Sequence, residues 1–379
     1  MFIETHGEVY RLGYLKLALA AEEALGGRPR SRNFKAAIAR AMMGFLKWLP
    51  VGCEGGSRNG VVSARSSFQT VRSYVILSEQ VLTPTLRRAL KSLSAYSSLV
   101  EEFLRFNNGL RPTMTHMKIL NLTAAERMLY TYALSTSDPL FVEVVRWVAG
   151  RGEFKRTEYF HEALSRIVPE AAAKYAEPAM GERIAEKARR FLEEYRSLCP
   201  DGRTSVAWIR SRAYNFCRHV LSPRVEWLVD LGLLAKKLGR RRRKAYEPTS
   251  KLRYCADAIL KLAAGDAAGY ADSIGRIAHA FSRNCTPLTT SFPLLSSHQD
   301  YASVLSEAYN ALSENGLEMV AEADLILAAA AKLADAGLRV SVKDVKGLED
   351  ALKIMYMANQ AYVKPTDRGK LVAIAGVNW

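Results

Sequence analysis

Residues 222–252, with the sequence SPRVEWLVDLGLLAKKLGRRRRKAYEPTSKL, constrain the fold of this chain more than any other stretch. Ser222 can cap a helix and Pro223 suits its first position, and the apolar residues that follow recur at helical spacing. Gly232 ends this pattern, since glycine adopts the left-handed conformation without steric cost. The sequence then predicts an apolar strand, a basic loop, a return strand and the cap of a further helix: Leu233–Ala235, Lys236–Lys244, Ala245–Glu247 and Thr249 or Ser250.

This order of helix, strand, basic loop, strand and helix resembles the recognition helix and wing of winged helix-turn-helix DNA-binding domains. The residues that carry the resemblance are the helix end WLVDLGLL and the hairpin KKLGRRRRKAYEPT, roughly a tenth of the chain. The resemblance implies a central winged-helix unit that binds duplex DNA. It names a superfamily rather than one activity, because many winged-helix domains serve only as protein–protein modules.

Positive charge is concentrated in the predicted loop. The chain has 54 Lys and Arg against 38 Asp and Glu, a formal net charge of +16. Seven positive charges and no negative charge lie in the loop: Lys236, Lys237, Arg240, Arg241, Arg242, Arg243 and Lys244. Adjacent arginines repel one another unless an anion neutralises them, so the cluster indicates a polyanion such as nucleic acid; a solvated loop is the alternative. Contacts of this kind fall on phosphates or the minor groove and do not select a base sequence.

A second basic surface is predicted on a helix over 205–221. Its core-facing residues repeat at helical spacing: Val206, Ile209, Ala213, Phe216 and Val220. Arg212 and His219 lie seven positions apart and share the opposite, exposed face. Arg224 extends this face, since it lies where the N-terminus of the following helix would enter the major groove. An ordinary surface helix is the alternative interpretation of these residues.

The chain as a whole is predicted to be mainly α-helical, with three consecutive domains. These are an N-terminal helical domain, a winged-helix-like domain with a helical insertion, and a C-terminal helical domain with a β-hairpin: 1–116, 117–283 and 284–379. The first boundary follows a linker that begins at Pro112, and the second begins a Ser/Thr/Pro-rich loop over 284–300. The C-terminal hairpin is predicted around Pro365–Gly369.

The winged-helix pattern is interrupted in this sequence. A helix opened by Asp138-Pro139 and another over 158–168 resemble the first two helices of such a domain. Residues 169–221 then intervene before the predicted recognition helix. Either they form a helical insertion, or the helix over 205–221 itself supplies the second helix.

The motifs of common enzyme classes and metal sites are missing from the sequence. The six histidines are scattered and form no HExxH or Hx3H pair, and the five cysteines form no CxxC pair. A glycine-rich stretch over 51–66 fits neither GxGxxG nor GxxxxGK[ST]. We therefore expect no metal and no cofactor. The tryptophans Trp147, Trp208 and Trp227 and the hairpin residue Tyr246 are predicted to be core residues.

These patterns favour a non-enzymatic protein that binds duplex DNA, with RNA as a possible ligand, acting as a regulator or genome-associated factor. Size, basicity and helical content are also loosely similar to those of a large or accessory subunit of archaeal type I CRISPR surveillance complexes, which act in antiviral defence. A nuclease is the third alternative. A regulator would be a homodimer, whereas a complex subunit would co-purify with RNA and protein partners.

The chain reads as a cytoplasmic protein. Its first residues contain charged side chains where a signal peptide requires an apolar core, and no run of 18 uncharged apolar residues occurs. An odd number of unpaired cysteines is typical of reduced thiols. Glutamine is scarce and arginine abundant, which is typical of a thermophile.

Overall fold

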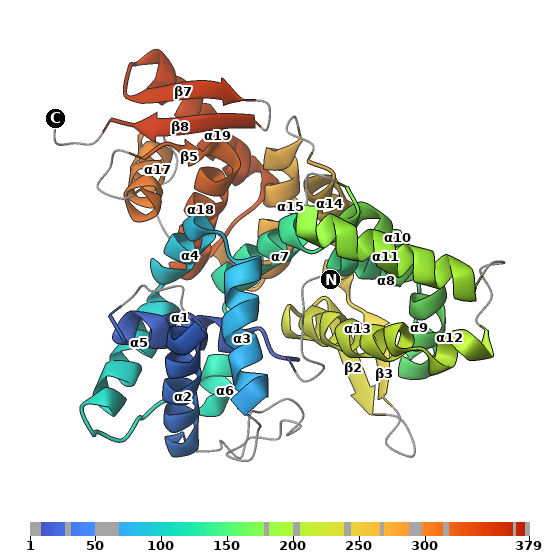
Figure 1. Ribbon diagram of the computed structural model, residues 1–379. Helices are drawn as coiled ribbons and strands as arrows, with labels where there is room; N and C mark the ends of the chain where they lie inside the picture. Colours follow the sequence, from blue (N-terminus) through green and yellow to red (C-terminus); the bar gives the residue numbers. More distant parts are fainter. Residues whose placement is uncertain are drawn as a thin grey trace. The chain divides into compact units, whose positions relative to one another are not determined.

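The computed structural model is mainly helical, with small sheets (Figure 1). It describes residues 9–26, 32–49, 68–177, 182–199, 205–238, 244–265, 269–287, 298–313, 318–366 and 369–375. The chain divides into two compact units, and each is assembled from discontinuous segments. Unit 1 contains residues 1–81, 103–121 and 137–256, and unit 2 contains residues 82–102, 122–136 and 257–379. The three consecutive domains expected from the sequence stay a prediction.

Unit 1 is built from helices and a three-stranded sheet. Its helices are α1 (Gly13–Ala24), α2 (Arg32–Trp48), α3 (Phe68–Val81), α6 (His116–Leu120), α8 (Pro139–Ala149), α9 (Arg156–Glu162), η1 (Ala163–Ile167), α10 (Val168–Tyr175), α11 (Glu182–Leu198), α12 (Val206–Arg210) and α13 (Arg212–Asp230). Its strands are β1 (Phe154–Lys155), β2 (Leu234–Leu238) and β3 (Lys244–Pro248). Two further helices, α5 (Ser94–Asn107) and α14 (Ser250–Ala263), each contain a boundary between the units.

Unit 2 combines helices with two small sheets. Its helices are α4 (Pro84–Lys91), α7 (Ala124–Ser137), α15 (Tyr270–Ser282), α17 (His298–Leu312), α18 (Glu322–Asp335) and α19 (Val342–Met357). Its strands are β4 (Thr286–Pro287), β5 (Val320–Ala321), β6 (Leu338–Arg339), β7 (Ala361–Thr366) and β8 (Gly369–Ile374). The antiparallel β7–β8 pair confirms the hairpin predicted near the C-terminus, and β5 extends it in the order β5-β8-β7.

Local capping signals place several helix starts. The Thr123 hydroxyl accepts a hydrogen bond from the Glu126 N–H, and the Glu126 carboxylate accepts one from the Thr123 N–H. This reciprocal pair satisfies two backbone donors that a helix N-terminus leaves unpaired, so it fixes the start of α7. Asp138 similarly caps α8, where Pro139 occupies the first turn.

The region of the predicted recognition helix differs from the prediction in two ways. The helix expected over 205–221 is broken at Ser211, whose hydroxyl accepts from the Tyr214 N–H and caps α13. Consequently Val206 and Ile209 are exposed rather than in the core. Helix α13 then runs without interruption through Pro223, so no helix begins at Ser222. A proline inside a helix costs about 3 kcal/mol, and the burial of residues on both sides of Pro223 offsets this cost.

The hairpin predicted after this helix is confirmed, but its connection is shorter than predicted, because Lys236, Lys237 and Lys244 lie in the strands rather than in the loop. Strands β2 and β3 pair in antiparallel register from Leu234 opposite Pro248 to Leu238 opposite Lys244. The short strand β1 pairs with the other edge of β3, so the sheet order is β1-β3-β2. Tyr246 is buried in this sheet, and its ring stacks on that of Phe154 from β1 at 5.6 Å between centroids. Trp147, Trp208 and Trp227 are core residues, as predicted.

No helix in the described residues is both long enough and apolar enough to cross a membrane.

Candidate nucleic-acid interface

The basic hairpin follows directly from α13 (Figure 1). Because Leu238 pairs with Lys244, the residues between them, Gly239–Arg243, make the connection between β2 and β3. The predicted arginine contacts Arg240, Arg241, Arg242 and Arg243 lie outside the described residues, and so does the side chain of Lys244. The structure therefore describes the strand before this connection, β2, and the strand after it, β3.

Two of the predicted contact residues, Lys236 and Lys237, form ion pairs within unit 1. The Lys236 ammonium lies 2.8 Å from the Glu226 carboxylate, and both side chains are largely buried. The Glu226 carboxylate also accepts a hydrogen bond of 2.8 Å from the Tyr246 hydroxyl. Burial, and to a lesser extent the negative charge of Glu226, raises the pKa of the Tyr246 hydroxyl. Lys236 therefore ties β2 to α13 and offers little free charge to a ligand.

Lys237 is half exposed and lies between two carboxylates. Its ammonium is 2.6 Å from the Glu247 carboxylate on β3 and 3.1 Å from the Glu153 carboxylate. The hydrogen bonds to Glu247 and Glu153 raise the pKa of Lys237. Its positive charge is thus neutralised locally across the hairpin. In the sequence Lys237 looks like a free cation, because neither carboxylate is adjacent to it in the chain.

The exposed face of α13 retains two of the predicted residues. Arg212 is the first residue of α13 and His219 lies two turns later, and both side chains are exposed. Their spacing places them on one side of the helix, as the sequence predicted. This face belongs to the helix that leads into the basic hairpin.

Arg224 does not belong to this surface. The prediction placed it exposed at a helix N-terminus, and this is wrong, because Arg224 is buried in the middle of α13. Its side chain is 0% exposed, and its Nε lies 3.0 Å from the equally buried Asp138 carboxylate. Its Nη1 donates to the Val220 carbonyl at 2.7 Å, and Asp138 also accepts a hydrogen bond of 2.7 Å from the Tyr175 hydroxyl. The guanidinium further lies over the Trp227 ring, 4.9 Å from its centroid.

Arg224 was misassigned because Asp138 lies 86 positions away along the chain. No local pattern in the sequence reveals such a partner. The ion pair joins the N-terminus of α8 to the middle of α13, and it is therefore a structural element of unit 1.

A polar pocket lies between α9 and α13, with a volume of about 520 Å³. It is lined by Tyr10, Arg156, Thr157, Phe160, Asn215, His219 and Ser222. Arg156 donates a hydrogen bond of 3.2 Å to the Ser222 hydroxyl, and its guanidinium lies 5.2 Å from the centroid of the Phe160 ring. Of these residues, only His219 is a predicted contact residue, because the pocket joins segments 66 positions apart in the chain.

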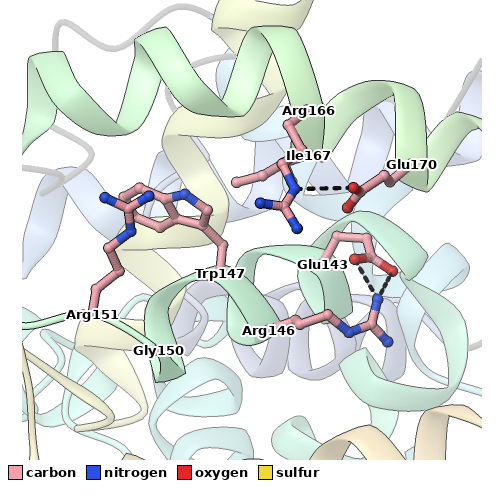
Figure 2. A pocket seen from close by; sticks show the side chains of 8 residues that line it. All are labelled: Glu143, Arg146, Trp147, Gly150, Arg151, Arg166, Ile167 and Glu170. Atoms are coloured by element: carbon pink, nitrogen blue, oxygen red, sulfur yellow. Dashed lines mark hydrogen bonds and ion pairs between the residues drawn. The ribbon is translucent and has the colours of Figure 1, made fainter.

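A smaller pocket of about 180 Å³ lies at α8, η1 and α10 and is lined by three arginines (Figure 2). Arg146 donates two hydrogen bonds of 2.5 Å to Glu143, and Arg166 donates one of 3.1 Å to Glu170. Arg151 lies over the Trp147 ring at 4.6 Å and forms an ion pair with Glu162. Each arginine of this pocket therefore has its own carboxylate.

Within the described ranges, no three His, Cys, Asp or Glu side chains gather as a metal ion would require. Comparison with known proteins found no matching family model, no matching curated protein and no matching solved structure.

Proposed function

We propose that α8, β1, α9, α13 and the β2–β3 hairpin form a winged-helix-like unit that binds duplex nucleic acid, DNA in the first place. The observation that carries the proposal is the pairing of β1 with β3. This pairing holds the basic hairpin to β1, the strand between α8 and α9. Strands β1, β2 and β3 therefore form one sheet, and α8, α9 and α13 belong to the same unit. A solvated surface loop needs no such support.

Packing of the three helices supports the same assignment. The buried Arg224–Asp138 pair joins α13 to the start of α8. The Tyr159 hydroxyl on α9 donates to the Leu221 carbonyl of α13 at 3.1 Å. Of the two alternatives for residues 169–221, this favours a helical insertion, because α13 already begins at Arg212 and α12 is a separate, short helix.

The surface proposed for nucleic acid is smaller than the sequence suggested. It consists of the arginine connection over 240–243 together with Arg212 and His219 on α13, since Lys236, Lys237 and Arg224 are engaged within the protein. If each of the four arginines contacts one phosphate, the logarithm of the binding constant should fall with the logarithm of the salt concentration with a slope of about −3.6. Affinity should then fall by about 100-fold between salt concentrations of ~50 and ~200 mM.

The test is fluorescence anisotropy with a labelled duplex across this salt range, for the wild type and for a variant with Arg240–Arg243 replaced by alanine. The variant should bind all duplexes more weakly and lose most of the salt slope, because phosphate contacts carry the affinity. A matched control removes the same charge from exposed positions of unit 2, by alanine at Lys343, Lys346, Lys353 and Lys364.

The proposal fails if the two variants bind alike, or if the wild type binds no duplex at low salt. Co-purification of the chain with RNA and other proteins, combined with no binding of duplex DNA by the isolated protein, would favour the alternative of a CRISPR-type complex subunit. Metal-dependent cleavage of the duplex in the same samples would favour a nuclease.

A further inference from the structure

The two pockets described above differ in the charge that their lining residues carry. In the smaller one, Arg146 is bound to Glu143 and Arg166 to Glu170 (Figure 2), and Arg151 forms an ion pair with Glu162, so their charge is neutralised within the protein. In the larger one, none of the seven lining residues is acidic, and within the described residues Arg156 forms no ion pair. A guanidinium always carries its charge in a protein. The larger pocket therefore presents a positive charge that a bound anion could neutralise.

Arg156 is held in position by neutral groups. The Ser222 hydroxyl accepts one of its hydrogen bonds, and its guanidinium lies over the Phe160 ring. A guanidinium has five N–H donors in a planar fork, so most of them are left for a further acceptor. Two parallel hydrogen bonds from such a fork match the oxygens of a phosphate or carboxylate. Because the two neutral contacts already restrict the side chain, less entropy is lost when it binds an anion.

The other walls of the pocket supply neutral polar groups and aromatic rings. Thr157, Asn215 and His219 can donate or accept hydrogen bonds, and Tyr10 and Phe160 offer ring faces or edges. A volume of about 520 Å³ is within the range of pockets that bind small organic molecules. This combination is suited to a ligand that has both an anionic group and a planar ring.

We propose that this pocket binds a small phosphorylated molecule with a planar ring, of which a nucleoside monophosphate is the simplest representative. Arg156 would bind the phosphate, and the polar and aromatic walls would bind the rest of the ligand. The pocket shares His219 with the proposed nucleic-acid surface, but the proposal is argued from Arg156 and does not require that the hairpin binds duplex DNA.

The experiment is isothermal titration calorimetry of the full chain with AMP and CMP, and with adenosine and inorganic phosphate as the two fragments. AMP or CMP should bind with submillimolar affinity, and adenosine should bind at least tenfold more weakly. Arg156→Ala should weaken nucleotide binding by roughly ten- to a hundredfold, the range expected for a lost hydrogen bond to a charged group. Arg156→Lys should recover only part of this loss, because an ammonium keeps the charge without the fork.

The matched control is Arg166→Ala, which removes an exposed arginine from the other pocket and should leave nucleotide binding unchanged. Thermal unfolding of each variant checks that the fold is retained. The proposal is overturned if neither nucleotide binds at millimolar concentration, if Arg156→Ala binds as tightly as the wild type, or if adenosine binds as well as AMP. It is also overturned if Arg156→Ala weakens the binding of a duplex while no nucleotide binds, since the pocket would then hold a phosphate of the nucleic-acid backbone.

Discussion

Replacing Arg224 should destabilise the protein strongly. In the wild type its guanidinium satisfies the buried Asp138 carboxylate at 3.0 Å, and both side chains are 0% exposed. Arg224→Met keeps most of the apolar volume but leaves a carboxylate without its counter-charge in the core. Two donors remain on that carboxylate, the Tyr175 hydroxyl and the Leu140 N–H. Removing one partner of a buried ion pair costs about 3–5 kcal/mol, a large part of the stability of a typical protein.

A double-mutant cycle separates this effect from simple loss of packing. Asp138→Asn alone should also destabilise, because it leaves the arginine charge buried and unpaired. The double variant carries no charge at the site, and asparagine still caps α8 and still accepts from Tyr175. Its free energy of unfolding should therefore be higher than that of Arg224→Met alone, so that the two single effects are far from additive.

Urea unfolding followed by circular dichroism at neutral pH gives these free energies. Arg166→Met is the control, because its ion pair with Glu170 is exposed on both sides and should contribute less than about 1 kcal/mol. Two results would contradict a buried ion pair of this strength: a stability of Arg224→Met within about 1 kcal/mol of the wild type, or additive single effects in the double variant. The first result would mean that Arg224 is accessible to solvent, as the sequence alone had suggested.

Three further results are expected. Burial raises the pKa of Asp324 to about 6, above its ordinary value near 4. Between these two pH values the carboxyl is protonated in the folded state and ionised in the unfolded state. The free energy of unfolding should therefore fall as the pH rises from about 4 to about 6. Urea titrations at about pH 4.5 and about pH 7 should show a smaller fall for Asp324→Asn, and an equal fall would contradict the assignment. Gly275→Ala should cost about 1–3 kcal/mol in unfolding free energy, because a Cβ there would meet the backbone of α19 at 2.7 Å, whereas Gly150→Ala, with open space around it, should cost less than half as much. Iodoacetamide at neutral pH should modify Cys285 before Cys255, whose pKa burial raises to about 12; mass spectrometry of timed samples that shows the reverse order would contradict this.

Local chemistry in the sequence was enough to predict the hairpin and the start of α8. The order of apolar strand, basic loop and return strand after Gly232 and the Asp138-Pro139 start each depend on neighbours within a few positions. Buried tryptophans and Tyr246 were likewise predictable, because large aromatic side chains at core spacing have few other places to go.

Interactions between distant residues were not predictable, and they decide the composition of the candidate site. Pro223 has the local signature of a helix start, yet packing along both sides of α13 keeps the helix continuous. Arg224 and Lys237 look like free cations in the sequence. The carboxylate partner of Arg224 lies 86 positions away, and Lys237 is paired with Glu247 on the facing strand and with Glu153, 84 positions away. Strand β1 has two residues, too few to show any alternation, so its pairing with β3 could be found only in three dimensions.

The discontinuous make-up of the two units has a consequence for how the protein is synthesised. The backbone passes from one unit to the other at residues 81/82, 102/103, 121/122, 136/137 and 256/257. On the ribosome the chain emerges from its N-terminus, so unit 1 cannot be completed until residue 256 has left the exit tunnel, by which time two pieces of unit 2 have already been exposed. Those early pieces, 82–102 and 122–136, must wait for the remainder of unit 2 before their apolar faces are covered. A chaperone that binds nascent chains would therefore find its most persistent substrate in these two segments.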